Sequence, residues 1–311
     1  MTSLPWAGRA AEMVGSIREA FLLQDHPLVG ILWDTVAARE VSRPMVVESL
    51  KRAHFRLLGE IHDNPIHHAL QAELLEALTA DGLRPIVAFE QMDREHDAAL
   101  QQRLTRGDAS AEDVARAVSF DRRGWNWSFY EPLVAIALRR GLPLRAANLS
   151  RSAAAQIARG GLSILAPARV AALRIEAAWT VEREQAMREI IRDGHCGALP
   201  ESAVPMMASA QRVRDATLAE SLWVNANPYG AVLIAGNGHV RRDLGVPIYL
   251  ATAGAGVSCS IGLIEVEAHK QSPQAYRADR PTQATSTGPL YDFVLFTPRV
   301  DRPDPCAAFR R

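Results

Sequence analysis

Lysine is almost absent from this sequence, because Lys51 and Lys270 are the only lysines among its 311 residues. Arginine supplies the other basic side chains, and 35 basic and 35 acidic residues balance to a formal net charge of zero. A neutral chain of this kind offers no excess of positive charge to a nucleic-acid backbone. We therefore expect no nucleic-acid partner, and we attribute the arginine bias to genome composition.

Cysteine is also scarce, and its three positions lie far apart in the chain. Cys196, Cys259 and Cys306 form no C-x-x-C pair, and their number is odd. This spacing supports neither a zinc ribbon nor a disulfide framework. The run His195-Cys196-Gly197 follows a predicted helix, and it is more typical of a turn than of a thiolate ligand.

Long apolar runs are missing as well. Residues 245–264 carry no charge, but Pro247, Gly254 and Gly256 interrupt them, so they predict two buried strands rather than a membrane span. Residues 1–30 lack the basic segment and apolar core of an export signal. The sequence therefore fits either a cytoplasmic chain or the mature part of an exported one.

Short apolar runs alternate with helical patterns in the rest of the chain, and hydrophobic residues make up 48% of it, enough for a full core. Residues 150–226 read as helical throughout. The expected fold is α/β, with a central, mainly parallel sheet flanked by helices in residues 1–149 and 227–311 and an inserted all-helical subdomain at 150–226. The runs predict neighbouring strands at 54–60, 84–90, 142–148 and 231–236, followed by strands at 246–251, 258–266 and 291–296.

Three finer expectations concern the connecting segments. Residues 1–53 read as an irregular or helical lead-in, with a weakly amphipathic stretch at 13–22. One helix is expected from Pro167 to Gly194, and the polar run 271–287 is expected to be a loop.

The most informative stretch is residues 54–78, where a buried strand leads through a polar turn into a helix. Asn64 and Pro65 are typical of the N-cap and first position of a helix. The turn between strand and helix carries Glu60 and His62, and in open α/β sheets ligands bind at this edge. We therefore place a candidate site there.

A second segment repeats the pattern, because residues 234–239 also run from an apolar strand into Gly-x-x-His, ending at His239. Glu90 ends a third predicted strand. We predict that Glu60, His62, Glu90 and His239 converge in one pocket, either as a metal-dependent or acid/base catalytic set, or with Glu60, His62 and His239 as ligands of a divalent metal ion. The alternative is that each histidine merely caps its turn.

These motifs together resemble the ChaN family, haem-binding uptake proteins in the Tiki, TraB and erythromycin-esterase superfamily. The resemblance runs from about residue 26 to residue 306. It rests on GEIHDNPIHHALQAELL, FEQMD, the Gln211-x-x-Arg214-Asp215 helix, GNGHVRRDLGVPIYL and YDFVLFTPRVDRPDPC.

The resemblance implies a parallel sheet with a smaller helical domain, and haem binding linked to uptake or storage of iron. It further implies a tyrosine as iron ligand, a homodimer with stacked haems and contact with components of a haem-uptake system. Family members are typically exported lipoproteins, in the periplasm or anchored to a membrane, but no lipobox is present here. Hydrolase relatives in the superfamily use the positions that correspond to Glu60, His62 and His239.

No local motif identifies the tyrosine ligand. We favour Tyr130, because it follows Trp125, Trp127 and Phe129, which form an aromatic cluster suited to a porphyrin wall. The alternative is that these rings pack helices onto the sheet. The other candidates are Tyr229, Tyr249, Tyr276 and Tyr291.

Other side chains complete the expected site. Arg214, with Arg122 or Arg123, is a candidate partner for haem propionates. The alternative for Arg214 is an internal salt bridge with Asp215 or a neighbour. His67 and Gln71 share a helix face near His62 and are candidates for supporting the bound cofactor, or else are ordinary half-buried helix residues. Haem binding is the preferred function, and a metal-dependent or acid/base hydrolase is the alternative.

Overall fold

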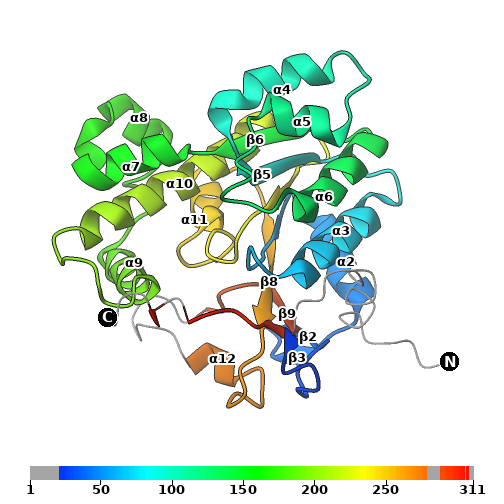
Figure 1. Cartoon of the computed structure of the whole chain (residues 1–311), viewed down its shortest axis with the longest axis vertical. Coiled ribbons are helices and arrows are strands. Elements are labelled where there is room, and N and C mark those ends of the chain that lie inside the picture. The colour runs from blue at the N-terminus through cyan, green and yellow to red at the C-terminus, as the bar shows by residue number, and fades with distance from the viewer. Residues whose placement is uncertain (1–20, 279–287, 305, 308–311) are drawn as a thin grey trace.

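The computed structural model describes residues 21–278, 288–304 and 306–307. An eight-stranded sheet forms its centre, in the order β3-β2-β9-β8-β4-β7-β5-β6, and a two-stranded ribbon pairs β1 with β10 (Figure 1). The strands are β1 (Phe21–Leu22), β2 (Leu32–Asp34), β3 (Arg39–Glu40), β4 (Phe55–Leu58), β5 (Ile86–Asp93), β6 (Leu144–Asn148), β7 (Ala231–Ile234), β8 (Ser258–Glu265), β9 (Phe293–Thr297) and β10 (Arg299–Val300).

Helices cover both faces of this sheet. Those in the described residues are α2 (Arg43–Arg52), α3 (Pro65–Thr79), α4 (Asp97–Leu104), α5 (Ala111–Ala117), α6 (Trp127–Arg139), α7 (Arg151–Gly160), α8 (Pro167–Ala172), α9 (Val181–Gly194), α10 (Val204–Asn225), α11 (Val246–Thr252) and α12 (Ala275–Ala278), with short 3-10 turns at Arg94–His96 and Leu162–Ile164.

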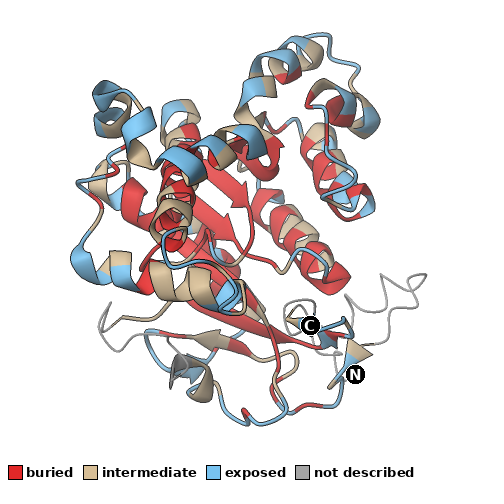
Figure 2. Ribbon diagram, turned by 60° about the vertical axis from the view of Figure 1, so that its left-hand side comes forward, coloured by how far each residue is buried: buried red, intermediate tan, exposed pale blue. Residues whose placement is uncertain are grey.

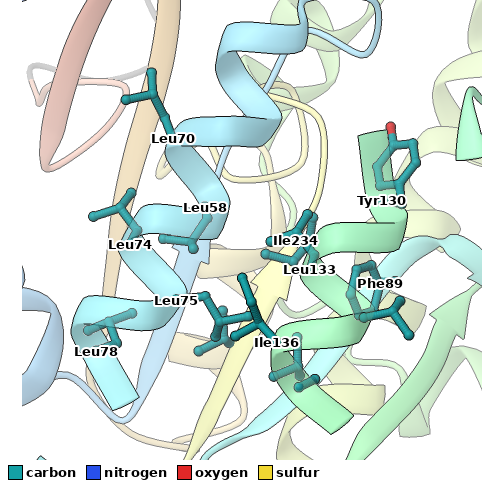
Figure 3. Close-up of a cluster of buried hydrophobic side chains, with 14 of the residues drawn as sticks. Leu58, Leu70, Leu74, Leu75, Leu78, Phe89, Tyr130, Leu133, Ile136 and Ile234 are labelled. Carbon is teal, nitrogen blue, oxygen red and sulfur yellow. The ribbon is translucent and has the colours of Figure 1, made fainter. Parts of the chain in front are cut away.

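The central strands are apolar on both sides, which is typical of parallel strands between two helical layers. Leu58 and Ile234 face α3 and α6, whereas Leu57 and Leu233 face the layer that contains α10 and α11. Figure 2 shows these strands buried between helices whose outer sides are exposed. Figure 3 shows leucines of α3 packed beside Leu58, Ile234 and α6.

The predicted fold class is confirmed. Six neighbouring strands run parallel: β9, β8, β4, β7, β5 and β6. At one edge of the sheet, β2 is antiparallel to both of its neighbours, β9 and β3. The four strands predicted as neighbours do lie together, in the order β4-β7-β5-β6. The sheet is mainly parallel because its strands alternate along the chain with crossover helices.

One predicted strand is wrong, because residues 246–252 form helix α11. Pro247 lies in the first turn of this helix, where its missing N–H is not needed. Val246, Ile248, Tyr249 and Leu250 are all buried, so the helix has no polar face that would reveal its period.

Other segments also differ from expectation. The single helix expected over 167–194 is divided into α8 and α9, with Arg174 at a φ of 58° between them. The lead-in contributes β2 and β3 to the sheet, while residues 13–20 of the amphipathic stretch lie outside the described residues. The expected loop 271–287 contains α12, and residues 279–287 also lie outside them.

Residues 150–226 contain helices α7 to α10 and contribute no strand. Helix α10 packs against β5, β6 and β7 as well as against α7, α9 and α11. The segment therefore covers one face of the sheet, and its division from residues 1–149 and 227–311 as a separate subdomain stays a prediction. None of the helices in the described part is long and apolar enough to cross a membrane.

A disulfide joins Cys196, just after α9, to Cys306 near the C-terminus, which corrects the expectation from cysteine spacing. The two residues are 110 positions apart in sequence, so no local motif reveals the pair. Cys259 is a buried free thiol. Cys196 itself lies in a turn with a φ of 57°.

Removing this bond should destabilise the chain. We expect Cys196→Ser to lower the free energy of unfolding by roughly 2–4 kcal/mol, because the bond restricts a long loop in the unfolded chain. Urea unfolding of the oxidised wild type and the variant measures this change. Reductant should lower the wild type to the level of the variant, and a wild type unaffected by reductant would contradict the disulfide.

Candidate functional site

Three neighbouring strands end at the same edge of the sheet. The parallel register places Leu58, Ile234 and Phe89 side by side on β4, β7 and β5. Glu60 lies two residues beyond the end of β4, and Glu90 follows Phe89 within β5, so both carboxylates lie at this edge. The turn after β7 brings His239 to the same place.

Glu60 is the centre of a buried hydrogen-bond network. Its Oε1 accepts from His62 Nδ1 at 2.7 Å, from Gln91 Nε2 at 3.0 Å and from the Tyr130 hydroxyl at 3.1 Å. His68 Nε2 lies 3.1 Å from both Glu60 Oε2 and the His62 carbonyl oxygen. These donors fix the carboxylate in one orientation.

His62 is the exposed member of this network, since its side chain is 42% exposed while that of Glu60 is fully buried. Its ring meets Trp125 edge to face, with centroids 4.5 Å apart. Burial lowers the pKa of His62, but the hydrogen bond and charge of Glu60 outweigh it and raise that pKa above its ordinary value. Among the described residues, none forms a hydrogen bond with its Nε2.

His239 is held on both sides. Its Nδ1 lies 2.5 Å from Asp215 Oδ1, and its Nε2 lies 3.1 Å from Glu90 Oε1. Burial opposes the charged ring, but the two carboxylates raise the pKa of His239 to about 10. The ring is therefore an imidazolium at neutral pH, with both nitrogens donating and no lone pair to offer.

The two carboxylates beside His239 differ. Burial would raise the pKa of Glu90, but the charge of His239 and the Gly236 N–H, 2.7 Å from Oε2, hold it well below its ordinary value. Burial raises the pKa of Asp215, and the charge of His239 offsets only part of this rise. The role of Asp215 was missed from the sequence, because nothing in helix α10 indicates that it meets a turn after β7.

His62, Glu90 and His239 border a polar cavity of about 290 Å³. Gln91 Oε1, Asn148 Oδ1 and Arg214 Nε are buried, and no partner for them exists among the described residues. Gln91 cannot reverse its amide, because its Nε2 donates to Glu60. Gln91 Oε1 and Asn148 Oδ1 are acceptors and Arg214 Nε is a donor, so the cavity is suited to a ligand that both donates and accepts hydrogen bonds. Its lining includes His62, Glu90, Trp125, Asn148, Arg214 and His239.

The expected metal site is not supported. No group of three or more His, Cys, Asp or Glu side chains in the described part of the chain is arranged to hold a metal ion. His239 has no free lone pair, and Glu60 is already surrounded by donors. Of the three side chains predicted as ligands, His62 alone opens onto the cavity with a free nitrogen.

Tyr130, the tyrosine favoured as iron ligand, does not line the cavity. Its side chain is fully buried, and Figure 3 shows it at the end of the aliphatic cluster with its hydroxyl pointing away from that cluster. Burial and the nearby Glu60 raise its pKa far above the ordinary value, which opposes a tyrosinate. Phe129 and Trp127 are 7% exposed and pack in the same core, whereas Trp125 reaches the cavity.

His67 and Gln71 brace the turn and do not reach the cavity. His67 Nδ1 accepts from the Ile61 N–H at 2.8 Å, and its Nε2 donates to Thr297 Oγ1 at 2.8 Å. Gln71 Nε2 donates to the carbonyl oxygens of Leu58 and Gly59. Both side chains are fully buried, and the supporting role expected of them from the sequence stays a prediction.

The chain resembles known proteins in both sequence and fold. Residues 46–250, more than half of the chain, match the model of the family described as haem-binding uptake, Tiki superfamily, ChaN. No curated protein matches the chain.

Among solved structures, the fold is similar to that of ChaN from Campylobacter jejuni, reported with cofacial heme binding. The TM-score is 0.67 at 20% identity, over 85% of this chain and 95% of that chain, which shows a common fold. An erythromycin esterase, EreC, gives 0.42 at 13% identity over 86% and 81% of the two chains. A Bacillus cereus protein gives 0.40 at 11% identity over 84% and 75%, and these two likenesses are too weak to support an inference.

The pairing of His239 predicts a pH dependence of stability. Because its pKa is raised from 6.5 to about 10 on folding, the imidazolium stabilises the native chain fully below pH 6.5, and this contribution is lost as pH rises through 10. We expect the wild type to lose its stability advantage over His239→Gln by roughly 1 kcal/mol per pH unit between pH 7 and 10. Urea unfolding at several pH values measures this loss of stability. Parallel plots of stability against pH for the two proteins would refute the pairing of His239 with Glu90 and Asp215.

Proposed function

Because this chain belongs to the ChaN family of haem-binding uptake proteins in the Tiki superfamily, we propose that it binds haem for the uptake or storage of haem iron. The similar Campylobacter jejuni protein is reported to bind heme cofacially. In this chain, the observation that carries the proposal is the half-exposed His62 ring beside Trp125 at the polar cavity.

The cavity contains three kinds of residue that a haem site uses. A haem site needs a ligand for iron, an aromatic or apolar surface and cations for the propionates. His62 offers a nitrogen, Trp125 a ring, and Arg151 and Arg214 two guanidinium groups at one cavity. Once bound, haem supplies the iron centre, and the residues of this chain hold and orient it.

The size of the cavity adds a constraint. A porphyrin is larger than 290 Å³, so haem held here projects from the cavity. An open hollow of about 520 Å³ also borders Trp125, and Arg122 and Arg123 line it. A projecting haem suits a homodimer, and we propose further that two copies of the chain enclose a haem pair and exchange it with components of an uptake system.

A second candidate function is an acid/base hydrolase. The specific observation in its favour is the Glu60–His62 pair, which can orient the ring so that Nε2 takes a proton from a nucleophilic hydroxyl or water. His239 cannot share this role, because it already carries its proton. This candidate needs no metal ion.

Haem binding is tested by adding haemin to the purified chain and recording the absorption spectrum. We expect saturable binding at micromolar concentration. Arg214→Gln should weaken it several-fold, because a propionate then loses a charged donor. Arg159→Gln, at an exposed position on α7, is the matched control and should bind as the wild type does. An absence of saturable binding would contradict the proposal.

The hydrolase candidate is tested with haem-free protein and a panel of esters and peptides without added metal. We expect that any turnover due to this site falls by at least about 100-fold in Glu60→Gln, because His62 then loses the carboxylate that orients it. Turnover unchanged in that variant would place the activity elsewhere. A panel with no turnover would eliminate the candidate for these substrates.

A further inference from the structure

Two buried amide groups that line the polar cavity carry oxygens without a partner. Gln91 is 4% exposed and Asn148 is 6% exposed. Neither Gln91 Oε1 nor Asn148 Oδ1 has a hydrogen-bond partner among the described residues. A buried acceptor that stays unpaired destabilises a fold, and a native chain keeps such a group where it serves another purpose. The two oxygens therefore point to a ligand that brings hydrogen-bond donors into the cavity.

Haem cannot bring these donors. Its propionates are carboxylates, which only accept hydrogen bonds when they are ionised, and the faces of the porphyrin are apolar. The cavity of about 290 Å³ is also just below the range of roughly 300–1,000 Å³ that is usual for small-molecule sites. A molecule much smaller than a porphyrin therefore fits the amide groups of Gln91 and Asn148.

The charges around the cavity balance one another. Its lining contains three carboxylates and three cations, namely Glu90, Asp93 and Asp121 against Arg151, Arg214 and His239. His239 counts as a cation because, although burial opposes its charge, Glu90 and Asp215 raise the pKa of its ring to about 10. When His62 is protonated, Glu60 at 2.7 Å balances its charge. An uncharged ligand suits this lining better than an anion or a cation does.

The cavity also offers a donor and an apolar wall. Arg214 Nε is buried and has no partner within the described part of the chain. Trp125, Val118 and Leu149 add apolar surface to the lining. A hydroxyl group both donates and accepts hydrogen bonds. A ring of carbon atoms that carries several hydroxyl groups therefore combines the polar edge and the apolar faces that this lining requires.

We propose that the cavity binds a small, uncharged, polyhydroxylated molecule of the size of a monosaccharide or an inositol. Its hydroxyl groups donate to Gln91 Oε1 and Asn148 Oδ1 and accept from Arg214 Nε, while its ring lies against Trp125. The half-exposed His62 leaves the cavity accessible from solvent. This inference goes beyond the haem-binding function and does not depend on it, because it concerns the haem-free chain.

The test uses the full, haem-free chain and three probes: myo-inositol, D-glucose and D-ribose. Saturation-transfer difference NMR detects binding directly, and the melting temperature reports stabilisation by a bound ligand. At least one probe should bind saturably at millimolar concentration. Tetrahydropyran, a ring without hydroxyl groups, should not bind, and neither should the charged molecules succinate and ethylamine.

Two variants connect this binding to the cavity. Asn148→Leu should weaken it about 10-fold, because the ligand loses one hydrogen bond. The melting temperature of Asn148→Leu without ligand should equal or exceed that of the wild type, since an unpaired buried amide is replaced by an apolar side chain of similar size. Arg214→Met, which removes the Nε donor, should weaken binding several-fold. Gln102→Ala, at an exposed position on α4, is the control and should bind as the wild type does.

Each outcome decides the proposal. Polyols also stabilise folded proteins by exclusion from their surface, so a rise in melting temperature supports the proposal only if it saturates and is weaker in Asn148→Leu. The proposal is overturned if none of the three probes binds, if both variants bind as the wild type does, or if succinate or ethylamine binds instead. An Asn148→Leu chain that melts well below the wild type would show that this amide is paired within the fold, and Arg214→Met then decides alone. The haemin titration is a separate measurement, so the haem-binding function stands or falls independently.

Discussion

The hydrogen bonds to the buried carboxylate of Glu60 are the interaction on which the site depends. A carboxylate removed from water is costly unless donors surround it. Here the donors come from different elements: His62 in the turn, Gln91 on β5 and Tyr130 on α6. His68 on α3 lies 3.1 Å from the second carboxylate oxygen. The packing of α3 and α6 on the sheet is therefore coupled to the orientation of one imidazole.

The outer side of the same turn is held by the C-terminal segment. Arg302 donates to both carboxylate oxygens of Asp63 at 2.7 Å and also pairs with Glu265. Asn64 caps α3 through the Ile66 N–H and donates to Glu265. The turn is thus fixed from both sides, which keeps His62 in place although its ring is half exposed.

The two Gly-x-x-His turns have similar sequences but different chemistry. His239 is enclosed by two carboxylates and is a fixed positive charge, whereas His62 has one carboxylate and one open side. Gly236 allows the His62 ring to lie close to the turn after β7, because a Cβ at this position would lie 2.9 Å from His62 Cε1. The open histidine is suited to bind or to exchange a proton, and the enclosed one to hold Glu90 and α10 in place.

Sequence patterns could predict the sheet and the edge where the site lies, because strand runs, the Asn64-Pro65 helix start and the glycine turns are local signals. They could not predict the partner of His239, since Asp215 comes from a helix whose docking depends on tertiary packing. They could not place Tyr130, because an aromatic cluster looks the same in sequence whether it lines a cavity or fills a core. Helix α11 was predicted as a strand because its residues 246–250 are uncharged and all buried, and the Cys196–Cys306 bond joins residues with no common motif.

The most direct measurement of the central claim is a haemin titration, followed by absorption, of the wild type and of Glu60→Gln. If the buried carboxylate of Glu60 holds the site in the orientation that binds haem, the wild type binds haemin saturably and Glu60→Gln binds it several-fold more weakly. A wild type that binds no haemin, or a variant that binds it as tightly as the wild type does, would contradict the account.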